Sequence, residues 1–208
     1  MPETRDKIVE AADQLIYQKG FEYMSFADVA SAVGISRGNV TFHFQTRDQI
    51  LEAVIDRRMD RTRSMLDQWE REGESAVERI KSFLNILIMN REKIMLYGCP
   101  VGTLCSELGK LEHFALPHAN KVFGLFRDWL SRQFAQLGRA READFLAMHL
   151  LAWSQGVAVL ASAFHDAKFI RAEVRKLQGW LDSLAKNAED NPTSRSGRRL
   201  RLAATRSR

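Results

Sequence analysis

The sequence predicts an all-α fold. Apolar residues recur at the three- and four-residue spacing of helices along most of the 208-residue chain. Glycine and proline are sparse, at 12 and 4, and several stand where a helical pattern ends. This length allows one or two domains with a sizeable core. Residues 25–51 differ from the rest, because helix starts and stops follow one another closely there.

The first predicted helix runs from about Thr4 to Lys19. Its apolar stripe has the spacing of one helix face and consists of Ile8, Ala11, Ala12, Leu15 and Ile16. Gly20 follows the stripe and is expected to end the helix. We expect this helix to cover the back of the segment that follows.

Residues 25–51 predict a helix-turn-helix. Ser25 and Asp28 have the spacing of a capping box, and apolar residues continue from there to Val33. Gly34 follows at the position where helices often end in a residue of left-handed conformation, which glycine adopts without steric strain. Ser36 then caps a second, short helix. In such motifs the second helix enters the major groove of DNA.

The remainder predicts a helical bundle. Thr46 and Gln49 form another capping box, which opens a long helix at Arg47 that Glu72-Gly73-Glu74 ends. Further helices are expected after Ser75, over Val101–Leu111, from Pro117 to Leu137 with Gly138 as its end, over Glu142–Phe164 and over Glu173–Ala188. From Asn191 onward the composition predicts an unstructured tail.

The stretch KGFEYMSFADVASAVGISRGNVTFHFQTRDQILEAV resembles the N-terminal domain of the tetracycline-repressor (TetR) family of transcriptional regulators. The match extends from about Arg5 to Val54. It implies a DNA-binding domain over residues 1–50, a ligand-binding and dimerisation domain over 51–190, and a basic tail over 191–208. Thr41 departs from the family pattern, which usually has Tyr there.

The predicted DNA contacts centre on the second helix of the motif. Arg37 can bind guanine and Asn39 adenine through paired hydrogen bonds. The resemblance implies phosphate contacts from Ser25, Thr41 and Arg47, while His43 fits either a DNA contact or plain helix surface. The full predicted set is Ser25, Ser36, Arg37, Gly38, Asn39, Thr41, Phe42, His43 and Arg47.

The resemblance also implies a cavity for a small-molecule inducer, although the same residues could simply form the bundle core. The predicted cavity residues are Phe83, Leu87, Cys99, Leu104, Leu108, Phe123, Phe126, Met148, His149 and Trp153. The segment YGCPVGTLCSELGK, residues 97–110, resembles a branch that includes regulators of multidrug-resistance and electrophile-response genes. At a helix start, Cys99 could react as a thiolate or fill a tight corner, whereas Cys105 is expected to be inert core.

A homodimer is expected, because two recognition helices must lie about 34–36 Å apart to bind a palindrome. Small and apolar residues at helical spacing in the last two helices resemble the four-helix dimer interface of the family, with burial inside one subunit as the alternative. The predicted interface residues are Ala152, Gly156, Val157, Leu160, Phe164, Leu177, Trp180 and Leu181.

The charge does not by itself indicate DNA binding. The net charge of +5 depends on six arginines in residues 191–208, and the rest of the chain has 25 basic and 26 acidic residues. Residues 1–50 contain five basic and seven acidic residues. We therefore expect DNA affinity to come from a few placed groups and helix N-termini.

Other classes of protein are not favoured. The chain has only two cysteines, which do not form a disulfide framework, and its start, MPETRDKI, lacks the apolar core of a signal peptide. The apolar stretch Gly156–Phe164 is too short to span a bilayer. We therefore expect a cytoplasmic protein without membrane contact. The five histidines have no metal-ligand spacing, and no cofactor or catalytic motif is present. The prediction is a ligand-responsive repressor, not an enzyme. The alternatives are a helical ligand-binding module or enzyme with an incidental helix-turn-helix, and an architectural DNA binder that uses the arginine tail.

Overall fold

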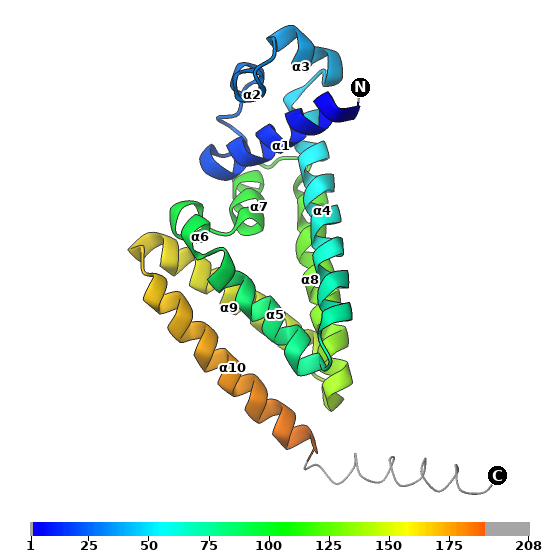
Figure 1. Ribbon diagram of the computed structural model, residues 1–208, viewed down its shortest axis with the longest axis vertical. Coiled ribbons are helices and arrows are strands. Elements are labelled where there is room, and N and C mark those ends of the chain that lie inside the picture. Colours follow the sequence, from blue (N-terminus) through cyan, green and yellow to red (C-terminus); the bar gives the residue numbers. More distant parts are fainter. Residues whose placement is uncertain (1, 190–208) are drawn as a thin grey trace, which may run out of the picture.

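The computed structural model describes residues 2–189, which form helices joined by short loops with no strand among them. The all-α prediction is therefore confirmed. Figure 1 shows a small head of α1, α2 and α3 above a larger body, and the long helix α4 runs from one into the other.

The head contains α1 (Pro2–Lys19), α2 (Phe26–Val33) and α3 (Arg37–His43). The predicted capping box is present, since the side chains and backbone amides of Ser25 and Asp28 bond reciprocally. Gly34 ends α2 with a φ of +75°. The head core consists of fully buried apolar side chains from all of these segments, among them Ile8, Phe21, Met24, Val29, Val40 and Phe44.

Helix α4 (Arg47–Glu72) begins at Thr46, whose hydroxyl accepts a hydrogen bond from the Gln49 amide at 3.2 Å. It continues without a break past residue 50, so head and body share one rigid element. The division at residue 50 stays a prediction, and a movement of α4 in the body would be transmitted directly to the head.

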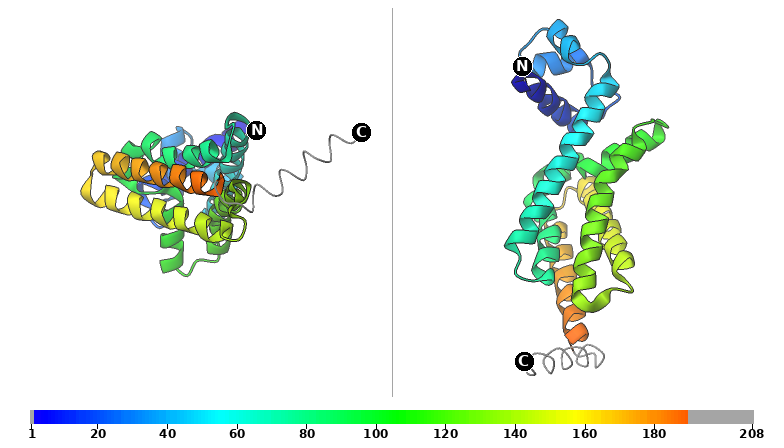
Figure 2. Two further views of the ribbon diagram at one scale, coloured as in Figure 1. Left: turned by 90° about the horizontal axis from the view of Figure 1, so that it is seen from below. Right: turned by 90° about the vertical axis from the view of Figure 1, so that its right-hand side faces the viewer.

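The body consists of α5 (Ala76–Met89), α6 (Arg91–Tyr97), α7 (Pro100–Lys110), α8 (Leu116–Phe134), a π-helical turn η1 (Ala135–Arg139), α9 (Ala143–Phe164) and α10 (Ala167–Glu189). Helices α8 and α9 pack against each other over much of their length, α4 lies along α8, and α10 lies along α5 (Figures 1 and 2). Helix α7 reaches up beneath α1.

Two helices differ from the sequence-based prediction. Helix α6 was missed because Asn90, at its start, gives no capping bond and instead donates its side-chain amide to the Ile86 carbonyl. Helix α10 begins at Ala167 rather than Glu173, because the Asp166 carboxylate accepts from the amides of Lys168 and Phe169. The predicted tail over 191–208 lies outside the described residues.

Helix α9 has 22 residues and, by length and composition, is the one helix within residues 2–189 that could cross a membrane. The sequence analysis considered only its segment Gly156–Phe164. In the structure 44% of its most apolar window is buried, as it packs against α8, α6 and α10. Its buried residues, which include Leu146, Leu150, Val157 and Ala161, recur at helical spacing. Packing in the core explains the apolar residues on the buried side of the helix, while Phe145, Val159 and Phe164 are exposed on its other side.

Candidate DNA-binding face and ligand cavity

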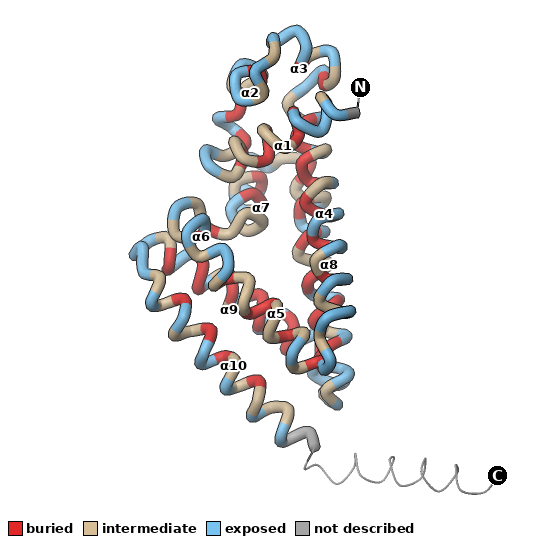
Figure 3. Tube along the Cα trace, in the orientation of Figure 1, coloured by how far each residue is buried: buried red, intermediate tan, exposed pale blue. Residues whose placement is uncertain are grey.

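Helix α3 lies at the outer end of the head, and most of its residues are exposed or half-buried (Figure 3). The Ser36 hydroxyl caps it by accepting from the Asn39 amide at 3.2 Å, and the fully buried Val40 fixes it to the head core. On the other side Arg37 and Asn39 are exposed, and so is Gly38 between them. This arrangement leaves the hydrogen-bonding groups of the helix start free to enter a groove.

The second turn of α3 carries the other predicted contacts. The Phe42 side chain is 80% exposed and meets the His43 ring edge-on, with ring centroids 5.3 Å apart. The Thr41 hydroxyl donates to the Gly38 carbonyl at 3.0 Å. These three residues stay predicted DNA contacts.

Two predicted phosphate ligands also hold the head together, which the sequence analysis missed. Nη1 of Arg47 donates to the carbonyls of Glu22 and Met24 at 2.9 and 3.1 Å, and its guanidinium lies over the Phe21 ring. The Ser25 hydroxyl donates to Asp28 at 2.6 Å. This bond, together with one from the Ser25 amide, lowers the pKa of Asp28.

A cavity of about 370 Å³ lies in the body beneath the head. Of the predicted cavity residues, five line it: Phe83, Leu87, Cys99, Phe123 and Phe126. Phe83 and Phe126 meet edge-on, with centroids 5.7 Å apart. The volume lies within the usual range for small-molecule sites, about 300–1,000 Å³.

The other predicted cavity residues do not line it. Leu104 and Leu108 are buried in the core beside it, while Met148 and His149 are exposed on α9. Trp153 lies away from it too, and its indole N–H donates to Glu173 at 3.5 Å. The rotation of α9 explains this correction, because it turns Leu151, Ser154 and Gln155 toward the cavity instead.

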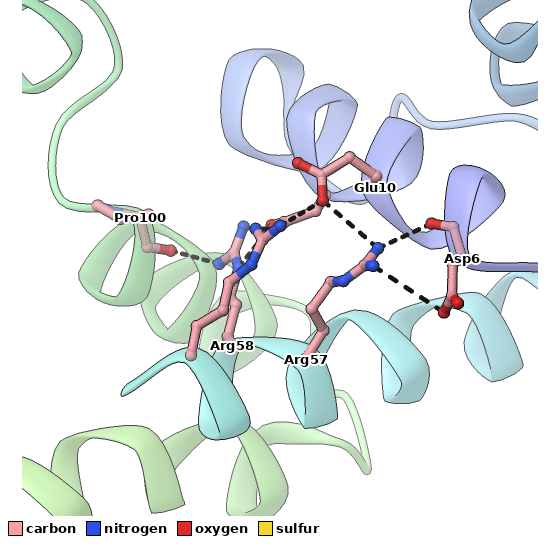
Figure 4. A network of polar contacts seen from close by, with 7 residues as sticks. Asp6, Glu10, Arg57, Arg58 and Pro100 are labelled. Atoms are coloured by element: carbon pink, nitrogen blue, oxygen red, sulfur yellow. Dashed lines mark hydrogen bonds and ion pairs between the residues drawn. The ribbon is translucent and has the colours of Figure 1, made fainter. Parts of the chain in front are cut away.

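One wall of the cavity is charged, which sequence reasoning did not predict. Nε of Arg58 on α4 donates to Asp13 on α1 at 2.7 Å, and its Nη1 donates to the Pro100 carbonyl at 2.6 Å. Asp13 also accepts from Arg61 at 3.2 Å. Figure 4 shows this network continuing through Glu10, which pairs with both Arg57 and Arg61.

A sequence signal for this wall existed. Arg58 falls on the same face of α4 as Val54, Ile55 and Thr62, all of which are buried. A charged residue on an apolar stripe needs a partner or a function. Its partner Asp13 sits beside the buried Ala12 on α1, but no local pattern connects the two helices.

Helix α7 joins the cavity wall to the head. The Glu107 carboxylate accepts from the amides of Phe21 and Glu22 in the α1–α2 loop at 2.9 and 3.0 Å. The Tyr17 hydroxyl donates to the Gly98 carbonyl at 2.8 Å, and burial raises the pKa of Tyr17 to about 12. The loop after α7 adds a contact between His113 and Asp48 of α4 at 3.3 Å.

The two cysteines occupy different environments. Cys99 is the N-cap of α7, at a helix start as expected, and its Sγ accepts from the Gly102 amide and the Gln155 side chain, each at 3.5 Å. Cys105 lies inside α7, and burial raises the pKa of its thiol to about 11. Within residues 2–189, no three His, Cys, Asp or Glu side chains gather as metal ligands would.

The predicted dimer residues fall into two groups. Ala152, Gly156, Leu160 and Phe164 are exposed along α9. Val157, Leu177 and Leu181 are instead buried within the subunit, and the Trp180 ring packs against Phe134 of the same chain. For this second group the structure corrects the sequence analysis, because α10 turns its apolar stripe toward α5.

Residues 8–54, which form the head and the first part of α4, match the family model described as bacterial regulatory proteins, tetR family. The DNA-binding head belongs to the TetR family. The chain is 25% identical over 173 residues to an uncharacterised helix-turn-helix transcriptional regulator of Lactococcus lactis subsp. lactis, covering 81% of this chain and 88% of that one. It is 35% identical over 54 residues, 26% of each chain, to the transcriptional regulator TtgR of Pseudomonas putida.

Solved TetR structures share the whole fold. A TetR transcriptional regulator from Legionella pneumophila superposes with a TM-score of 0.76 at 24% identity, covering 86% of this chain and 96% of that one. This likeness extends the shared fold from the head to the body, and the relatives named above are described as transcriptional regulators.

Proposed function

We propose that this TetR-family regulator is a repressor that binds a palindromic operator as a homodimer and is released by a small molecule in the 370 Å³ cavity. The observation that carries the proposal is the shared helix α4. Its first turn belongs to the head, and Arg58, Arg61, Thr62 and Met65 farther along it line the cavity. In this proposal residues 1–50 bind DNA in the cytoplasm, residues 51–190 bind the inducer and the second subunit, and no catalytic step is involved.

The DNA-binding part of the proposal rests on the exposed start of α3. An operator selected from random DNA with the purified protein gives the ligand for the test. We expect Arg37→Ala and Asn39→Ala each to relax the base preference at one operator position, at about 1–3 kcal/mol of discrimination. Arg71→Ala, at the far end of α4, is the control. Equal loss on operator and random DNA would contradict the assignment of these residues to bases.

The dimer part rests on the outer face of α9. Phe145, Val159 and Phe164 are 73%, 64% and 75% exposed there, and Met148 and Leu160 are about half exposed. A row of large apolar side chains on a surface marks an interaction site, and the second copy of this chain is the partner we propose. We expect Leu160→Arg to give monomers in light scattering and Arg71→Glu to leave dimers. A monomeric wild-type chain would overturn the proposal.

Deleting residues 191–208 separates operator recognition from general attraction to DNA. The tail contains six arginines and no acid, so its removal is expected to lower affinity for random DNA at low salt. We expect the operator preference to remain. A changed preference would instead favour an architectural role for the tail.

A further inference from the structure

The guanidinium of Arg58 is incompletely satisfied. The residue is 7% exposed and lines the cavity. Its Nε and Nη1 donate to Asp13 and Pro100, but its Nη2 is buried without a hydrogen-bond partner among the described residues. An unpaired buried donor costs free energy, and more so on a charged group. Nη2 is closed off from the cavity by its surroundings, so a ligand oxygen would reach it after a rotation of the guanidinium, and the new bond would remove that cost.

The cavity wall also has an excess of positive charge. Arg58, Arg61 and Lys93 line it, against Asp13 as the one lining carboxylate among the described residues. Asp13 already lies between two guanidiniums. Glu10 pairs with Arg61 and with Arg57, which does not line the cavity and also pairs with Asp6, so the positive charge left for a ligand is that of Arg58 and Lys93. The wall that a ligand would meet therefore favours an anion.

The rest of the cavity favours an apolar, flat molecule. Phe83, Phe123 and Phe126 provide aromatic surfaces, and Leu87, Ile94 and Leu151 complete the apolar lining. Aromatic rings pack on one another edge-on or offset, and these contacts add binding free energy beyond that of burying the ligand surface. Lys93 is exposed, so it lies where the cavity meets solvent.

We propose that the cavity binds an aromatic carboxylate, with its ring system among the phenylalanines and one carboxylate oxygen accepting from Nη2 of Arg58. This inference rests on the proposed function in taking the cavity as the inducer site, and it adds the chemical class of the inducer.

The same contact gives a route to the head. The two other bonds of Arg58 lead to Asp13 on α1 and to Pro100 at the start of α7. A second carboxylate on the guanidinium competes with Asp13, whose remaining partner is Arg61. Weakening the Asp13–Arg58 pair frees α1 from α4, so the ligand would act on the helix that supports the DNA-binding motif.

The first test is ligand binding by calorimetry on the full-length protein without DNA. The probes are biphenyl-4-carboxylate, its neutral carboxamide, and 4-(aminomethyl)biphenyl, which share one ring system and differ in charge. We expect the carboxylate to bind at least ten times more tightly than the carboxamide, and the ammonium compound to bind most weakly. Equal binding of carboxylate and carboxamide, or no binding of the carboxylate, would overturn the proposal.

The second test uses variants. Arg58→Gln is expected to reduce the preference for the carboxylate to less than twofold, and Arg57→Gln, its neighbour outside the cavity, to keep it. Because Arg58→Gln leaves the buried Asp13 with Arg61 as its remaining partner, the double variant Asp13→Asn/Arg58→Gln is measured as well, with folding checked by circular dichroism. A tenfold preference that survives in either Arg58 variant would place the anion elsewhere and refute the assignment.

The anion site and the inducer function of the cavity can be tested separately, because different results would contradict each of them. If the wild-type protein prefers the carboxylate but the carboxylate does not release it from its operator, the anion site stands and the inducer function of the cavity falls. If the carboxylate and the carboxamide bind equally and both release the protein from its operator, the proposed function stands and the role of Arg58 is wrong.

Discussion

The two ends of α4 are held in different ways. In its lower half Leu66 is buried, Trp69 packs on Trp129 with ring centroids 5.6 Å apart, and the carboxylate of Glu70 accepts from Trp129, Gln133 and Arg79 of the same bundle. The upper half packs Ile50, Leu51, Val54 and Ile55 into the core of the head, but its contact with α1 also depends on ion pairs, which Arg57, Arg58 and Arg61 form with acidic residues of that helix.

This difference separates a fixed part of the protein from an adjustable one. Apolar side chains packed at high density have one good arrangement, and any displacement leaves a void. Partly exposed ion pairs, such as those of Arg57 and Arg61, can exchange one partner for another at smaller net cost, whereas the buried pair of Arg58 and Asp13 needs a replacement partner. The cavity lies between the two halves, so a ligand there can change the upper contacts while the lower bundle stays folded. The four predictions below test this contrast, from the largest expected effect to the smallest.

Phe134→Ala tests the lower bundle. Phe134 is fully buried at the end of α8, and removing such a ring costs about 3–5 kcal/mol through lost burial and the void left behind. We expect the unfolding free energy in urea to fall by that amount. The folded fraction of the variant should keep wild-type affinity for the operator, and a specific loss of DNA affinity would show that the lower bundle also controls the head.

Gly20→Ala and Gly34→Ala test the junction with a matched pair. Both glycines have positive φ, +92° and +75°, so each substitution carries backbone strain of about 1–2 kcal/mol. A Cβ on Gly20 would also lie 2.8 Å from Glu107 Oε1, whereas one on Gly34 meets nothing within 4 Å. We expect Gly20→Ala to be the more destabilising of the two in thermal melts. Equal losses of melting temperature in the two variants would mean that the Glu107 side chain moves aside without a cost in stability.

The capping box of α2 gives a prediction about pH. Bonds from Ser25 lower the pKa of Asp28 below its ordinary 3.8 in the folded protein. A depressed folded-state pKa means that the stabilisation is fully present above the unfolded value and is lost as the pH falls through the folded value. We expect Asp28→Asn to flatten the acid side of the melting-temperature profile below about pH 4. Asp67→Asn, an exposed site on α4, should leave the profile unchanged.

The two cysteines should differ in their response to electrophiles. Because burial raises the pKa of Cys105 to about 11, this thiol is almost entirely protonated at pH 8. Cys99 is half-buried, lines the cavity and accepts two N–H groups. We expect N-ethylmaleimide to weaken operator binding in wild type and in Cys105→Ser, but not in Cys99→Ser. Weakening that persists in Cys99→Ser would leave Cys99 as a corner residue only.

The head could be predicted from sequence because its determinants are local. Ser25 with Asp28, Gly34 and Ser36 each act within a few residues, and all three lie where the pattern put them. The body is determined by long-range packing. Packing against α8 and α10 sets the orientation of α9 about its own axis, which turns Met148 and Trp153 away from the cavity. The spacing of apolar residues along α9 does not determine this orientation.

The candidate site shows the same limit. Asp13 and Arg58 are 45 positions apart, so their ion pair and the unsatisfied Nη2 appear only once α1 and α4 are packed together. Arg47 illustrates a second limit, because its position at the start of α4 suggested a phosphate contact, whereas the fold also uses it to hold the α1–α2 loop.

The most direct test of the adjustable junction is operator affinity in two variants of similar stability. Glu107→Ala removes the carboxylate that holds the amides of Phe21 and Glu22, while Ile80→Val removes one methylene from the lower core, at about 0.5–1.5 kcal/mol. Fluorescence anisotropy with labelled operator should show a Kd at least ten times higher for Glu107→Ala and a change in Kd below twofold for Ile80→Val. Equal affinities for the two variants would contradict the account, because the junction would then have no specific hold on the head.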